Sequence, residues 1–88
     1  MKAKQGFVLR HVMDEYILMP TDDMIEAFHG SVVLNGTSAF VWEKLQSETT
    51  KEALLSAILS EYDVTEPIAS EALDTMLDKF TQYGLIEP

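Results

Sequence analysis

The core of this protein is organised around SVVLNGTSAFVWEKL, which runs from residue 31 to residue 45. Residues 31–34 favour a β-strand, whereas residues 39–45 are apolar around much of a helical circumference. Asn35 lies between them and is a favourable N-cap, because its side-chain oxygen can accept a hydrogen bond from an amide two or three residues on. Strand and helix must therefore pack on a common core. The strand is apolar on both faces, so it is expected to be central or covered.

Two further strands are predicted upstream of this segment. Residues 7–13 and residues 16–19 are rich in apolar and β-branched side chains, with an acidic pair at 14–15 between them. This pattern favours an antiparallel hairpin with a two-residue turn at the acidic pair. Pro20 is expected to end the second strand, because it has no amide hydrogen to donate. Residues 21–30 show no clean period and are interpreted as a loop, with room for one helical turn.

Two more helices are predicted downstream. Thr49 and Glu52 have the spacing of a capping box, and apolar residues then recur at intervals of three and four. Thr65 is expected to cap the third helix, with Pro67 in its first turn, where a missing amide hydrogen costs little. Gly84 is expected to end this helix in a left-handed conformation.

This order of elements indicates one α+β domain over residues 1–88. The arrangement resembles a winged helix-turn-helix, in which a three-stranded antiparallel sheet is followed by three helices. A chain of 88 residues supports one hydrophobic core, and neither a repeat nor a linker divides it.

The composition excludes several classes of site. The chain has no cysteine, so disulfides, thiol nucleophiles, iron–sulfur ligation and thiolate zinc sites are ruled out. The first thirty residues carry scattered charges and no long apolar run, so no signal peptide and no membrane-spanning helix is expected. A cytoplasmic location is the expectation that follows.

The charge of the chain argues against nucleic-acid and membrane partners. Fifteen acidic and six basic residues give a formal charge of −9, which repels phosphates and anionic lipid surfaces. In a winged helix the third helix would approach DNA. Here that helix has one basic residue, Lys79, against Glu66, Glu71, Asp74 and Asp78. The charge either keeps the protein soluble or attracts a basic partner.

Few residues could carry catalysis. His11 and His29 are 18 positions apart and lack the spacing that would place two imidazoles on one helix face. No Gly-x-Ser-x-Gly segment occurs, and the glycines are too isolated to form a phosphate-binding loop. We expect no enzyme activity, no catalytic residue, no metal site and no cofactor.

A family resemblance extends over nearly the whole chain. It rests on seven segments in this order: GFVLRHV at 6–12, EYILMP at 15–20, LNGTSAFVWEKL at 34–45, TKEAL at 50–54, LSEYDV at 59–64, Phe80, and GLI at 84–86. These segments resemble the PqqD family, the small protein of pyrroloquinoline quinone biosynthesis and its relatives. Gly36 departs from the acidic residue of the family pattern, but Asn35 alone can cap the helix.

The resemblance implies a non-catalytic peptide chaperone. Such recognition elements hold the leader of a ribosomally made precursor peptide and present its core to a modifying enzyme, often a radical S-adenosylmethionine enzyme. The pathway would make the quinone cofactor or another modified peptide. The lack of cysteine agrees with a division of roles between a peptide-binding domain and a separate enzyme, because the iron–sulfur cluster of a radical enzyme would have to lie on that partner.

We expect the peptide to add as a strand to a free sheet edge and to place apolar side chains in a groove. The edge is predicted at Ser31, Val32, Val33 and Leu34, and the groove wall on the third helix at Ser70, Leu73, Asp74 and Leu77. Asp74 is the predicted partner of a basic leader residue. A register error of one residue would exchange Val32 with Val33.

Two alternatives from other classes stay open. The chain could be an accessory or interaction subunit that binds no leader peptide and buries the edge strand in a homodimer. It could also be a transcriptional winged helix, against which the charge of −9 argues.

Overall fold

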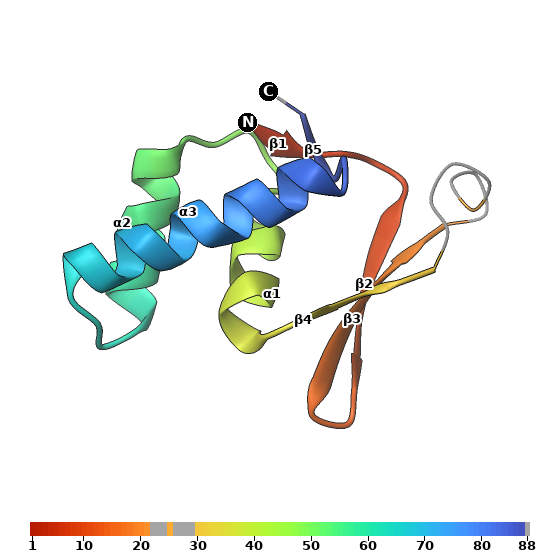
Figure 1. Cartoon of the computed structure of the whole chain (residues 1–88), viewed down its shortest axis with the longest axis horizontal. Coiled ribbons are helices and arrows are strands. Elements are labelled where there is room, and N and C mark those ends of the chain that lie inside the picture. The colour runs from red at the N-terminus through yellow and green to blue at the C-terminus, as the bar shows by residue number, and fades with distance from the viewer. Residues whose placement is uncertain (22–24, 26–29, 88) are drawn as a thin grey trace.

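A computed structural model describes residues 1–21, 25 and 30–87 of the chain (Figure 1). The predicted order, three strands of one sheet followed by three helices, is confirmed. The elements are β1 (Lys2–Ala3), β2 (Phe7–Val12), β3 (Glu15–Pro20), β4 (Val32–Leu34), α1 (Gly36–Lys44), α2 (Lys51–Glu61), α3 (Glu66–Gln82) and β5 (Ile86–Glu87). Most of the predicted loop at 21–30 lies outside the described residues.

The main sheet is antiparallel, in the order β2-β3-β4. Val12 pairs with Glu15, so the two-residue turn is Met13-Asp14 and lies one position earlier than predicted. The backbone of Met13 takes a positive φ of 56°, which supplies the turn geometry without a glycine. Pro20 ends β3 as expected.

β4 lies at an edge of this sheet, because β3 is its only neighbour in the described part of the chain. Side chains alternate along the strand, so Val32 and Leu34 point into the core and are 8% and 4% exposed. Val33 points outward and is 55% exposed. Of the two expectations for this strand, a central position is wrong, because β4 is an edge strand. Its middle residue remains in contact with solvent.

The helix starts follow side-chain capping. Asn35 Oδ1 accepts a 2.8 Å hydrogen bond from the amide of Ser38, which confirms the predicted cap of α1. In α2 the capping side chain is Thr50, whose Oγ1 accepts from the amide of Ala53 at 3.1 Å. The prediction of Thr49 was thus one residue early.

The cap of α3 departs from the prediction in one respect. Thr65 occupies the N-cap position and Pro67 lies in the first turn, but the Thr65 side chain makes no capping hydrogen bond. Gly84 has a φ of +70°, as the predicted left-handed C-terminal cap requires.

The two ends of the described chain meet in a second sheet that the sequence did not reveal. β1 and β5 pair antiparallel, with Ala3 opposite Ile86. The amide of Lys4 also donates to the carbonyl of Leu85 at 2.8 Å, and the amide of Ala3 donates to the carbonyl of Leu45 at 2.7 Å. Figure 1 shows this small sheet at the end of α3, away from the β2–β3 hairpin.

The core joins the sheet to the helices through α1. Trp42 is 3% exposed and packs edge-on against Phe80 of α3 and Phe7 of β2, with ring centroids 5.6 Å and 6.4 Å away. α1 follows β4 directly and lies between the sheet and the α2–α3 pair (Figure 1). No helix among the described residues is long and apolar enough to cross a membrane.

Candidate functional site

A groove of about 470 Å³ lies between α3 and the junction of β4 with α1. One wall is formed by Asn35 and Ser38, at the N-terminus of α1. The other wall is one side of α3: Ile68, Glu71, Ala72, Thr75, Met76 and Lys79. A second hollow shares Thr75 and Lys79 with it and continues along α3 to Gln82 and Tyr83.

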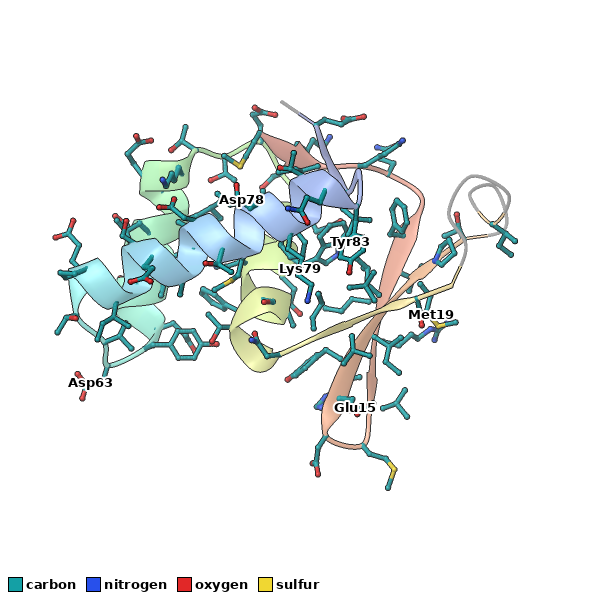
Figure 2. The ribbon with its side chains drawn as sticks, in the orientation of Figure 1. Glu15, Met19, Asp63, Asp78, Lys79 and Tyr83 are labelled. Atoms are coloured by element: carbon teal, nitrogen blue, oxygen red, sulfur yellow. The ribbon has the colours of Figure 1, made fainter. Side chains whose placement is uncertain are left out.

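The helical period explains why these α3 residues share a side. Ile68, Ala72, Thr75 and Lys79 are spaced at i, i+4, i+7 and i+11, which is one stripe of an α-helix. Figure 2 shows Lys79 and Tyr83 on the side of α3 that faces β4. Ile68 is 62% exposed, so the groove has an apolar rim that solvent reaches.

The α3 residues predicted for the groove wall do not line this groove. Leu73 is 0% exposed and Leu77 is 9% exposed, so both belong to the core. Asp74 forms an ion pair with Lys51 of α2, and the hydrogen bond between them raises the pKa of Lys51. Ser70 is half-buried on the same side. This set therefore lies on the side of α3 that faces the core and α2, where Leu73 and Leu77 share one buried cluster with Val32 and Leu34, and not on the side that lines the groove.

The predicted strand residues divide into two groups. Val32 and Leu34 are buried on the inner face of the sheet, so their side chains are not available to a ligand. Ser31 is exposed and precedes β4, and Val33 is exposed on the outer face. What this segment offers at its edge is therefore main-chain hydrogen-bonding groups rather than a row of side chains.

The outer face of the main sheet is a second exposed surface. Because β2, β3 and β4 pair in register, four apolar side chains lie together on it: Val8, Val12, Met19 and Val33, which are 40%, 51%, 45% and 55% exposed. Arg10 lies in the row Arg10–Ile17–Val33 across this face. The outer face adjoins the free edge at β4, where both surfaces include Val33.

The titratable side chains of the described residues were the next candidates for a functional site. No group of three or more His, Asp or Glu in the described ranges could hold a metal ion. His11 stacks on Tyr16 across the hairpin, with ring centroids 4.2 Å apart, and His29 lies outside the described residues. The site that the structure does present is a free strand edge beside a groove of mixed polarity.

The chain is similar to known proteins in its sequence and in its fold. A family model described as Coenzyme PQQ synthesis protein D (PqqD) matches residues 15–86. A search of the curated proteins found no match.

Two solved structures share the fold. The first is TbiB1 in complex with the TbiA(beta) leader peptide, with a TM-score of 0.76 and 24% identity, covering 99% of this chain and 95% of that one. The second is lasso peptide synthetase B1 complexed with the leader peptide, with a TM-score of 0.73 and 15% identity, covering 99% and 96%.

Proposed function

The chain belongs to the PqqD family, and from this premise we propose that it is a non-catalytic domain that binds the leader of a ribosomally made precursor peptide. Both similar structures are complexes with leader peptides, which supports a peptide as the partner of this fold. The observation that carries the proposal is the free edge of β4, which ends at Leu34, one residue before Asn35 in the wall of the groove.

The proposed mode of binding is strand addition. An extended peptide pairs with the outer edge of β4, and its main-chain hydrogen bonds supply affinity that does not depend on its sequence. Alternate side chains of the peptide then point toward α3 and enter the groove, where the exposed Ile68 and Ala72 provide apolar contact and Met76, which is 9% exposed, forms part of the floor. Leu73 and Leu77 support this wall from the core and do not touch the peptide.

The second part of the proposal is presentation to an enzyme. A leader held on β4 leaves the rest of the precursor free for a modifying enzyme, for which a radical S-adenosylmethionine enzyme is our candidate. Its iron–sulfur cluster would lie on that partner, since this chain has no cysteine. The product is the quinone cofactor or another modified peptide, made in the cytoplasm.

The test is a calorimetric titration with a synthetic leader peptide, encoded by a short reading frame beside the gene. The peptide is then scanned with single N-methyl groups, which remove one amide donor at a time. Strand addition predicts that affinity falls at every second position, because alternate amides face β4. A scrambled peptide is the control. Saturable binding without this alternation would contradict strand addition, and no binding would contradict the proposed function.

A homodimeric accessory subunit is the second candidate, because the free β4 edge could equally pair with a second copy. Sedimentation velocity at micromolar concentration separates the two functions. A stable dimer that binds no leader peptide would favour the accessory subunit, whereas a monomer that binds the peptide would exclude it.

A further inference from the structure

The groove carries opposite charges toward its two ends. Glu71 and Lys79 both line it, and they lie eight residues apart on α3, which is about 12 Å along the helix axis. The ion pairs found within the described ranges, Met1 with Glu48 and Lys51 with Asp74, use neither residue. Lys79 is also the only basic residue of α3. Both charges are therefore available to a ligand in the groove.

Between the two charges the groove is mostly apolar or neutral. Ala72, Thr75 and Met76 all fall between Glu71 and Lys79 in the sequence and line the groove with them. The order along α3 is thus an acidic group, a central section that accepts an apolar side chain, and a basic group.

The spacing of these three features matches an extended peptide. A strand rises about 3.3 Å per residue and directs every second side chain to the same face, so residues i, i+2 and i+4 span about 13 Å. This span is close to the axial separation of Glu71 and Lys79. Three side chains on one face of a bound strand can therefore reach Glu71, the central section and Lys79 at the same time.

The charges of Glu71 and Lys79 also distinguish the two directions in which a bound peptide strand can run along β4. In Figure 1, α3 and β4 run in opposite directions. A peptide that pairs antiparallel with β4 therefore runs in the same direction as α3, from Glu71 toward Lys79. A parallel peptide would meet the two charges in reverse order.

We propose that this groove selects a charged motif in the leader peptide: a basic residue, an apolar residue two positions later and an acidic residue two positions after that. The basic side chain faces Glu71, the apolar side chain lies over Ala72 and Met76, and the acidic side chain faces Lys79. The motif fixes both register and direction of the leader. This inference rests on the proposed function, since it requires a peptide on the β4 edge.

The test uses a display library of random 12-residue peptides selected on the intact protein, so no natural leader needs to be known. We expect enriched peptides to carry the basic–x–apolar–x–acidic motif. Lys79→Glu should weaken a selected peptide about fivefold, because an exposed attraction becomes a repulsion. Exchanging the acidic residue of the peptide for lysine should restore the affinity for this variant. Lys4→Glu is the control, since it changes the net charge equally at an exposed residue outside the groove.

The outcomes separate the two proposals. Selected peptides that show alternating N-methyl sensitivity but no charged motif, or that bind Lys79→Glu as well as the original protein, would overturn the charge selection and leave strand addition standing. Loss of the alternation would overturn strand addition, and failure to enrich any peptide would overturn leader binding itself. If Lys79→Glu does not fold, Lys79→Gln removes the same attraction without adding a negative charge, and it should weaken the peptide by a smaller factor.

Discussion

Replacing Leu73 and Ile68 separately by alanine tests whether one side of α3 packs in the core and another side lines the groove. Both substitutions remove three carbon atoms, but Leu73 is 0% exposed in the core and Ile68 is 62% exposed at the rim of the groove. At about 0.8 kcal/mol per buried carbon and with a cavity left behind, Leu73→Ala should cost about 3 kcal/mol of unfolding free energy. Ile68→Ala should cost about 1 kcal/mol or less, because most of its side chain already meets water.

Urea denaturation provides the measurement, followed through the fluorescence of Trp42, which is buried beside Phe80 in the folded protein. For a domain of this size, the loss at Leu73 corresponds to a fall in melting temperature of roughly 12 to 24 °C. The binding data should have the opposite ranking: Ile68→Ala weakens a groove peptide, and Leu73→Ala leaves its affinity unchanged at temperatures where the variant is folded. Equal loss of stability in the two variants would refute the assignment of Ile68 to the groove and Leu73 to the core.

Three further predictions concern helix ends and one ion pair. Thr50→Ala should cost about 1 kcal/mol in thermal unfolding, whereas Thr49→Ala should cost little, because only the main chain of Thr49 is hydrogen-bonded; equal losses would contradict this. Gly84→Ala should cost about 1 kcal/mol from its φ of +70° alone, since no atom of the described residues other than its chain neighbours lies within 4 Å of the added carbon, and a much larger loss would indicate a further contact. Asp74→Asn should lower the pKa of Lys51, measured by NMR titration, because their hydrogen bond is the main cause that raises it. The contribution of this pair to stability is complete below the unfolded-state pKa of lysine and is lost as the pH rises through the higher folded-state pKa. An unchanged Lys51 titration would contradict the pairing.

Most of the fold could be predicted because local signals agree with the tertiary structure. Asn35 is both a good N-cap and the first residue after an apolar strand, and the structure uses it in both ways. The errors are shifts of one residue where neighbours offer similar chemistry. Thr49 and Thr50 are both capping residues, and the main-chain bond from Thr49 to Met1 leaves Thr50 as the cap. β1 and β5 are two residues each, too short to show a period.

The candidate site could be predicted only in part. Its strand edge could be predicted, because an apolar segment comes directly before a helix. Which of Val32 and Val33 points outward depends on the register of β4 with β3, which the sequence does not determine. The groove side of α3 depends on how that helix is rotated against α1 and α2. An apolar stripe such as Leu73 and Leu77 marks the side that is buried, so the groove has to be sought on a neighbouring side, where apolar, polar and charged residues mix.

The exposed outer face and free edge of the main sheet also determine the pH and salt conditions under which the isolated protein stays soluble at high concentration. An edge strand with one unpaired side, next to a sheet face that exposes several valines, is a template on which further chains can stack into fibrils. At neutral pH the formal charge of −9 opposes this stacking by repulsion between molecules. Acidification toward the isoelectric point near 4.4 removes that barrier, and high salt screens it. The free edge that would bind a peptide thus also makes the protein prone to aggregate, and acidic storage is the condition under which we expect most aggregation.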